Sequence, residues 1–121
     1  MRYAKTVKEQ DTAIFESGQV HPVYATFAIA RDAEWTCRQF VLAMKEEDEE
    51  GIGTFVSVEH VSPALLEKEV NFEAVVTSLS GNEIKCSYEA KIGDALIAKG
   101  RQTQKILKKD EIETLFKSVR R

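Results

Sequence analysis

Apolar side chains recur at helical spacing over one long segment of the chain, from Pro22 to about Met44. Intervals of three and four residues place such positions on one side of a helix, where they can face a hydrophobic core. Pro22 suits the first turn, because its missing N–H would have no partner there. The pattern therefore predicts a helix over 22–44 with one apolar stripe. The stripe consists of Ile29, Ala33, Cys37, Phe40 and Met44.

The hydrophobic pattern changes to a period of two after Gly53, which is typical of a strand. Val58 and His60 fall on one face of this strand, and a Ser-Pro pair ends it. Three further strands are expected over 69–79, 83–92 and 95–107, with turns at 80–82 and 93–94. Because short turns join antiparallel neighbours, these strands predict a meander. Gly100, inside the last strand, indicates a bulge or a close approach to the helix.

The two ends of the chain and the segment after the helix carry weaker patterns. An interrupted strand is expected over 5–15, ending at Ser17, and a final helix over 111–119 with Asp110 as its N-cap. The acidic run over 45–53 opposes the dipole of the preceding helix, which indicates a solvated loop.

The expected order of elements is one strand, one long helix and then four strands. A single helix has no second helix against which to bury its apolar stripe, so it must pack on a sheet that curls around it. A chain of 121 residues suits one domain, and no linker or internal repeat divides residues 1–121. The pattern predicts a single α+β domain with a curved antiparallel sheet wrapped around a central helix.

Composition and charge exclude several classes of protein. A net charge of -3 and a pI near 5.5 argue against a nucleic-acid partner, which favours a basic surface. The lack of a long apolar run or an apolar leader argues against a membrane partner and against secretion. Cys37 and Cys86 lack metal-ligand spacing, so we expect reduced, buried thiols in a cytoplasmic protein without a metal site.

Two polar side chains of the predicted helix lie on the same side of it. Thr26 and Glu34 are eight residues apart, which leaves them about 80° apart around a helix with roughly 100° per residue. His60 falls on the strand face that is turned towards the helix. Because an ionisable group buried without a partner is costly, the three should meet one another or a ligand.

Each of these residues also has a purely structural explanation. Thr26 could cap the helix by accepting a hydrogen bond from a free N–H. Glu34 could lie on a solvated face beside Arg31 or Arg38. His60 could be a core histidine whose hydrogen bonds are satisfied.

The motif V-Y-A-T-x7-E-W, followed by G-T-x5-H, resembles the fluoroacetyl-CoA thioesterase-like branch of the hotdog thioesterases. The order of elements is also similar to the hotdog fold, in which a curved antiparallel sheet wraps a central helix. The resemblance implies a catalytic triad at Thr26, Glu34 and His60. It also implies a glycine on the substrate side at Gly53, a position that a turn could equally explain.

The sequence departs from this family in two places. Val20 stands where the fluoroacetyl-specific enzyme has a gating phenylalanine, and the segment over 17–20 is too short for that enzyme's aromatic lid. The family's G-T-H-E-R is replaced by G-R-Q-T-Q over 100–104, so Gln104 stands in place of an arginine and its contact. We therefore expect activity on several short or medium acyl chains, with little preference for fluoroacetyl-CoA.

The function that the resemblance implies is hydrolysis of an acyl-CoA thioester to a free acid and coenzyme A. No cofactor is expected, and a homodimer or dimer-based assembly would place the sites at the subunit interface. The alternative is a non-catalytic acyl-CoA-binding module; a third hypothesis is a dehydratase, whose usual Asp/His pairing is not evident. Several basic residues could meet the phosphates of coenzyme A or be ordinary surface charge: Lys99, Arg101, Lys105, Arg120 and Arg121.

Overall fold

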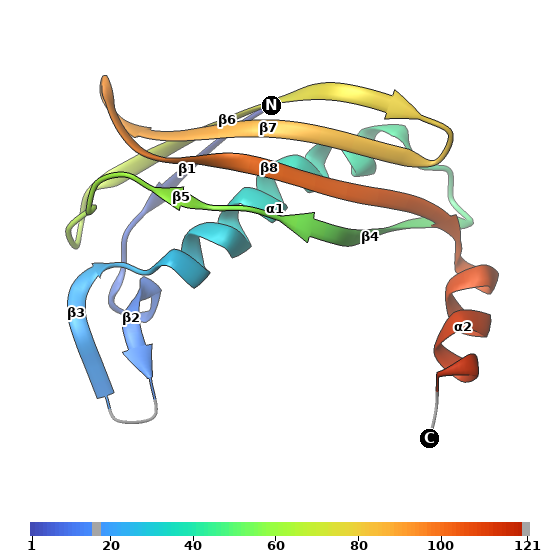
Figure 1. The fold of residues 1–121 in the computed structure, drawn as a ribbon, viewed down its shortest axis with the longest axis horizontal. Coiled ribbons are helices and arrows are strands. Elements are labelled where there is room, and N and C mark those ends of the chain that lie inside the picture. The colour runs from blue at the N-terminus through green and yellow to red at the C-terminus, as the bar shows by residue number, and fades with distance from the viewer. Residues whose placement is uncertain (16–17, 120–121) are drawn as a thin grey trace.

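One long helix, α1 (Thr26–Met44), lies against a curved antiparallel sheet in the computed structural model, which describes residues 1–15 and 18–119 (Figure 1). The strands of this sheet are β1 (Arg2–Thr6), β4 (Glu49–Val56), β5 (Glu59–His60), β6 (Glu69–Ser80), β7 (Glu83–Ile92) and β8 (Ala95–Lys108). Their order is β1-β6-β7-β8-β4, and β5 pairs with the first part of β8. The predicted curved sheet around one helix is confirmed.

The predicted meander is confirmed in β6, β7 and β8. Tight turns at Gly81 and Gly93 join these strands, and both glycines have a positive φ, 59° and 57°, which side chains disfavour. Alternate residues of β7 are buried, namely Ile84, Cys86, Tyr88 and Ala90. The alternation gives the sheet one face that packs on α1 and one face that is exposed to solvent.

Most of the predicted apolar stripe on α1 is buried. Ile29, Ala33 and Cys37 are at most 1% exposed, Phe40 is half-buried, and Met44 in the last turn is 44% exposed. The helical period therefore identifies the core face correctly except at the C-terminal end of the helix.

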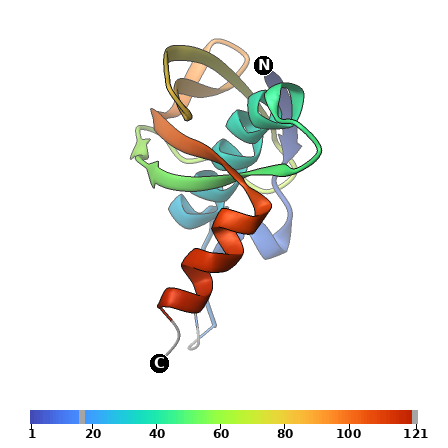
Figure 2. The same cartoon turned by 90° about the vertical axis from the view of Figure 1, so that its right-hand side faces the viewer.

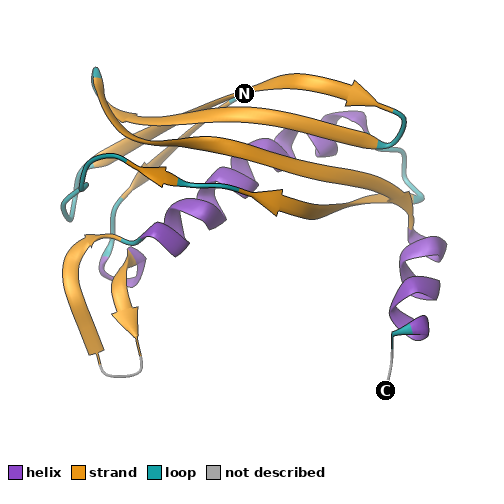
Figure 3. Ribbon diagram, in the orientation of Figure 1, coloured by secondary structure: helices purple, strands orange, loops and turns teal. Residues whose placement is uncertain are grey.

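The segment before α1 differs from the single interrupted strand predicted over 5–15. β1 is followed by a 3₁₀ turn, η1 (Glu9–Asp11), and by a hairpin of β2 (Thr12–Phe15) and β3 (Gly18–Tyr24). Pro22 lies within β3, so the prediction that it opens the helix is wrong. The hairpin projects from the sheet at the N-terminal end of α1 (Figure 3).

Asp11 explains why the chain breaks after β1. Its carboxylate is fully buried, accepts a hydrogen bond from the Lys8 backbone N–H and forms ion pairs with Lys5 and Arg31. A buried carboxylate needs such partners, and gathering them bends the chain. Ser17, where the predicted strand was to end, lies outside the described residues.

The acidic run after α1 is only partly a loop. β4 begins at Glu49, because residues 49–53 pair with the last part of β8, from Gln104 to Lys108. The loop predicted over 45–53 is therefore wrong for its second half, where cross-strand pairing outweighs the local preference of the acidic residues.

The continuous strand predicted after Gly53 is broken at Ser57 and Val58, between β4 and β5. The Ser57 carbonyl accepts a hydrogen bond of 2.6 Å from the Tyr88 hydroxyl, and the Ser57 N–H donates to β8. Gly100 makes the predicted close approach, but to this break and not to α1. A Cβ on Gly100 would lie 2.0 Å from the Ser57 carbonyl oxygen.

A second helix, α2 (Lys109–Ser118), follows β8 and projects away from the sheet (Figure 2). It starts two residues before the predicted helix over 111–119, and its N-cap residue is Lys108 and not Asp110. None of its residues is buried. Neither α1 nor α2, the helices of the described part of the chain, is long and apolar enough to cross a bilayer.

Candidate active site

Thr26 and His60 meet at the N-terminal end of α1. Oγ1 of Thr26 lies 3.0 Å from Nδ1 of His60, which is hydrogen-bonding distance. With the ring proton on Nε2, the threonine hydroxyl donates to Nδ1. Ala25 and not Thr26 occupies the N-cap position, and no side chain caps this end of the helix. The helix-cap explanation of Thr26 is therefore wrong.

The imidazole of His60 reaches Thr26 because the break between β4 and β5 resets the strand. His60 pairs with Ala98, whose side chain faces the core, so the histidine points to the same side of the sheet. Its Nε2 is buried and has no hydrogen-bond partner among residues 1–15 and 18–119. Most buried polar atoms in proteins are paired, so His60 is not the satisfied core histidine of the structural explanation.

Glu34 lies two turns further along the exposed side of α1. Its Oε1 would be 1.9 Å from a Cβ on Gly53 and accepts a hydrogen bond of 3.5 Å from Nε2 of Gln102. Gly53 lies within β4, paired with Gln104, and its φ is not positive. The turn explanation of this glycine is therefore wrong, and its lack of a side chain gives space to the Glu34 carboxylate.

The arginines near Glu34 have other partners. Arg31 bonds Asp11 and Asp32, and Arg38 bonds the Glu50 carboxylate at 2.7 Å. Glu34 does lie on an exposed face, as its structural explanation expects, but neither arginine pairs with it. In the described part of the chain, side-chain hydrogen bonds join Thr26 to His60 and Glu34 to Gln102, and none joins these two pairs.

Two buried glutamines on β8 were not among the predicted site residues. Gln102 is fully buried and Gln104 is 2% exposed, and both lie on the inner face of the sheet. Oε1 of Gln102 and both amide atoms of Gln104 have no hydrogen-bond partner in the described structure. The sequence signal was their alternation with Ala98 and Gly100, which places polar amides on a strand face whose other residues are apolar or glycine.

A buried ionic cluster supports the start of α1. The Tyr24 hydroxyl donates to Asp32, whose carboxylate also binds Arg31, and Arg31 reaches Asp11 at 2.7 Å. The carbonyl of Asp11 accepts the N–H of Ala25, the residue before Thr26. The sequence signal was an Arg-Asp pair inside an apolar helix. The cluster ties the hairpin to the first turns of the helix.

The cluster contains two groups whose pKa values are shifted in opposite directions, Asp11 and Tyr24. Burial tends to raise the pKa of Asp11, but Arg31, the Lys8 N–H and Lys5 together outweigh burial and hold that pKa below its ordinary value of 3.8. Burial, followed by the neighbouring Asp32 carboxylate, raises the pKa of the Tyr24 hydroxyl far above its ordinary value. Tyr24 therefore acts only as a hydrogen-bond donor.

Other features of the molecule lie apart from this site. Cys37 and Cys86 are free and buried, as expected. The described residues hold no group of three His, Cys, Asp or Glu side chains suited to a metal ion.

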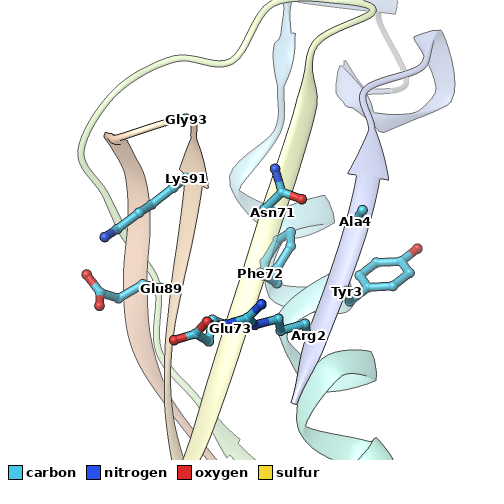
Figure 4. Close-up of a pocket in the computed structure, with 9 residues that line it drawn as sticks. All are labelled: Arg2, Tyr3, Ala4, Asn71, Phe72, Glu73, Glu89, Lys91 and Gly93. Carbon is cyan, nitrogen blue, oxygen red and sulfur yellow. Dashed lines mark hydrogen bonds and ion pairs between the residues drawn. The ribbon is translucent and has the colours of Figure 1, made fainter.

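A depression of about 380 Å³ is formed by β1, β6 and β7, where Arg2 pairs with Glu73 at 3.0 Å (Figure 4). Its lining includes none of the candidate site residues.

Comparison with known proteins extends these observations. A Thermus thermophilus protein of the thioesterase superfamily is 36% identical, with a TM-score of 0.92 over 98% of this chain and 88% of that chain. A mutant of the fluoroacetyl-CoA-specific thioesterase FlK, solved with fluoroacetate and CoA, is 18% identical, with a TM-score of 0.87 over 98% and 97%. A hot-dog-like protein from Thermanaerovibrio acidaminovorans is 20% identical, with a TM-score of 0.88 over 100% and 90%.

A protein-family model also matches the chain. No curated protein matches the chain significantly. Residues 7–110 match the model of the FlK family, described as fluoroacetyl-CoA-specific thioesterase. The match spans both motifs and every strand of the sheet except β1, so the hotdog fold and the family expected from the sequence are confirmed. The chain belongs to the fluoroacetyl-CoA-specific thioesterase family and is an acyl-CoA thioesterase of the hotdog fold.

Proposed function

We propose that this thioesterase hydrolyses short or medium acyl-CoA thioesters with Thr26, His60 and Glu34, at the interface of a homodimer. The observation that carries the proposal is the 3.0 Å contact between Oγ1 of Thr26 and Nδ1 of His60. A hydroxyl within hydrogen-bonding reach of a basic imidazole is the arrangement that nucleophilic catalysis requires. A pure binding module would not need it.

In the first candidate mechanism Thr26 is the nucleophile. Its oxygen attacks the thioester carbonyl carbon while His60 takes the hydroxyl proton. The carbon–sulfur bond then breaks, and the sulfur of coenzyme A receives that proton. A water molecule, activated in turn by His60, hydrolyses the threonine ester and releases the free acid.

In the second candidate mechanism water attacks the thioester directly. Glu34 takes the proton from this water, and the Thr26–His60 pair orients the carbonyl or protonates the leaving sulfur. Glu34 is suited to this role because it lies on the exposed side of α1, with its carboxylate held beside Gly53. The kcat of the Thr26→Ala variant separates the two mechanisms.

Both mechanisms need a group that stabilises the negative charge on the carbonyl oxygen. The first turn of α1 is suited to this role, because no side chain caps it and Ala25 is its N-cap residue. The N–H groups near Thr26 and Ala28 and the positive end of the helix dipole would face the developing oxyanion.

A second copy of the chain is the partner that we propose for the open side of the site. In the described structure the sheet ends at β4, whose outer edge has no neighbouring strand. Phe27, Trp35 and Val56, which lie on α1 and β4, are between 40% and 50% exposed. Unpaired strand edges are commonly covered by association, and the exposed apolar side chains would add to the area that a second copy buries. Sedimentation at micromolar concentration should give a dimer or a multiple of it, and a monomer would contradict the shared site.

The basic residues proposed to meet coenzyme A are in part engaged elsewhere. Lys99 pairs with Glu59 at 3.8 Å, and the guanidinium of Arg101 lies 5.9 Å from the centre of the Phe55 ring. Arg120 and Arg121 lie outside the described residues. Lys105 is exposed on β8, so it is the simplest candidate of this set for a phosphate contact.

The decisive test is release of free thiol from a panel of acyl-CoA substrates by the wild-type chain and by Thr26→Ala. A nearly complete loss of kcat supports the threonine nucleophile, and a modest loss supports attack by water. Thr77→Ala, an exposed threonine on β6, is the matched control and should keep wild-type kinetics. Binding of acyl-CoA without any thiol release by the wild-type chain would favour the non-catalytic module.

A further inference from the structure

Gln102 is a fully buried polar residue to which neither candidate mechanism gives a role. It lies on the inner face of β8, opposite Cys86 of β7 and Val56 of β4. Its Nε2 donates to Oε1 of Glu34 at 3.5 Å and to the Thr103 carbonyl at 3.3 Å. A buried amide is costly without partners, and the one side-chain partner in its hydrogen bonds is a proposed catalytic group.

Gly53 faces Gln102 across the Glu34 carboxylate. A Cβ on Gly53 would lie 1.9 Å from Oε1 of Glu34 and 3.4 Å from Nε2 of Gln102. The carboxylate therefore occupies space that any other residue at position 53 would fill. Strand β4 supplies the space, and strand β8 supplies the hydrogen-bond donor beside it.

We propose that Gln102 is a positioning residue that fixes the Glu34 carboxylate for thioester hydrolysis; this rests on the proposed function. The amide donor fixes one carboxylate oxygen against the sheet and leaves the other free to orient water or substrate. A neutral donor suits this task better than a cation, because it holds the carboxylate without cancelling its charge. Misplacement of a catalytic group by a small distance lowers rates strongly.

Gln104 provides a matched comparison within the same strand. It is two residues further along β8, on the same face, and 2% exposed. Neither of its amide atoms has a hydrogen-bond partner among the described residues. A substitution at Gln104 therefore reports the cost of changing a buried glutamine here, and one at Gln102 reports that cost plus the loss of the bond to Glu34.

The experiment compares Gln102→Met with Gln104→Met, because methionine keeps the length of the side chain and removes the amide. Gln102→Met should lower kcat about tenfold, as expected for losing a hydrogen bond to a charged group, and change KM less than about twofold. Gln104→Met should keep kcat within about twofold of wild type. Gln102→Asn, which keeps an amide but cannot reach Glu34, serves as a second variant and should behave like Gln102→Met.

A double variant shows whether Gln102 acts through Glu34. If it does, Gln102→Met added to Glu34→Gln should lower kcat no further than Glu34→Gln alone. Additive losses in the double variant, equal losses from Gln102→Met and Gln104→Met, or wild-type kcat in both Gln102 variants would each overturn the inference. Wild-type kcat in Glu34→Gln would instead remove Glu34 from the catalytic groups of the proposed function, so the two failures are distinguishable. Thermal melting identifies any variant whose loss comes from unfolding.

Discussion

The two halves of the candidate site are held in different ways. Thr26 and His60 touch directly, across the start of α1 and the short strand β5, and this contact is exposed. Glu34 has no hydrogen bond to either of them, and its carboxylate lies between Gly53 and the buried amide of Gln102. One half is therefore assembled from two proposed catalytic groups, and the other from one such group and its buried surroundings.

The supports behind the two halves differ in chemistry as well. Behind Thr26 lies the ionic cluster of Tyr24, Arg31, Asp32 and Asp11, which fixes the start of the helix through charges. Behind Glu34 lie neutral amides and a glycine. Changes of charge or pH should therefore disturb the position of Thr26. Changes in the volume or length of neighbouring side chains should disturb the position of Glu34.

The largest effect is expected from His60→Ala, which removes the base from the first half. kcat should fall by about 10²–10⁴, the usual contribution of a general base. Steady-state thiol release measures the loss. His21→Ala is the matched control, because His21 is the other histidine and is exposed on β3. Unchanged kcat in a folded His60→Ala variant would remove His60 from the mechanism.

Asp11→Asn should weaken the ionic cluster and destabilise the fold by about 1.5–3 kcal/mol at pH 7, the range for a lost hydrogen bond to a charged group. The folded-state pKa of Asp11 lies below 3.8, so its contribution to stability is present above that value and is lost as the pH falls below it. The variant should therefore lose less stability than the wild type on acidification.

Urea unfolding from pH 7 to pH 3 measures both effects of Asp11→Asn. The matched control is Asp48→Asn, because Asp48 also pairs with a lysine and has a lowered pKa, but lies on the surface. Its stability at pH 7 should change much less, since exposed pairs contribute little. Equal losses in the two variants would show that burial of Asp11 does not matter.

Gly53→Ala should displace the Glu34 carboxylate and lower kcat about tenfold or more, because a small misplacement of a catalytic group is costly. Stability should change little, since the displaced atoms are the free end of a flexible side chain.

Gly51→Ala is the comparison and should lower stability while leaving kcat nearly unchanged. The Cβ of this variant would meet Cγ1 of the buried Val41 at 2.6 Å. Overpacking of this kind costs about 1–3 kcal/mol. Kinetics and thermal melting of both variants sharpen the contrast, and wild-type kcat in Gly53→Ala would contradict it.

The smallest effect concerns the choice of substrate. We expect kcat/KM for fluoroacetyl-CoA and acetyl-CoA to agree within about tenfold, because weak discrimination is usual where no dedicated contact exists. The neutral Gln104 stands at the position of the family's arginine, and it is buried in the sheet. Competition between the two substrates measures the ratio. A ratio of roughly several hundred would show that residues of the hairpin or of the proposed second subunit recognise fluorine.

Local patterns predicted the elements that local physics controls. The helical stripe that contains Ile29 and Ala33 and the turns at Gly81 and Gly93 follow from periodicity and backbone preference, and the structure has them. The errors fall where distant contacts decide. Pro22 lies in a hairpin and not in a helix. The strand after Gly53 breaks where Tyr88 of β7 binds the Ser57 carbonyl and Arg101 of β8 binds the Ser57 N–H.

The same division applies to the site. The pairing of Thr26 with His60 was predictable, because the motif spacing and the strand alternation point to it. The bond between Glu34 and Gln102 was not, because it joins residues that are 68 positions apart and depends on the register of β8. The ionic cluster beneath α1 was missed for a similar reason, since Asp11 and Arg31 are 20 positions apart.

The contact between Gly100 and Ser57 has a consequence for sequence variation. A Cβ at position 100 would meet backbone, the Ser57 carbonyl oxygen at 2.0 Å, and not a side chain that can turn away. Any substitution must therefore shift the junction that carries His60, which follows Ser57 by three residues. In a saturation library selected for thioester hydrolysis, position 100 should tolerate glycine alone, although it lies outside the proposed catalytic groups.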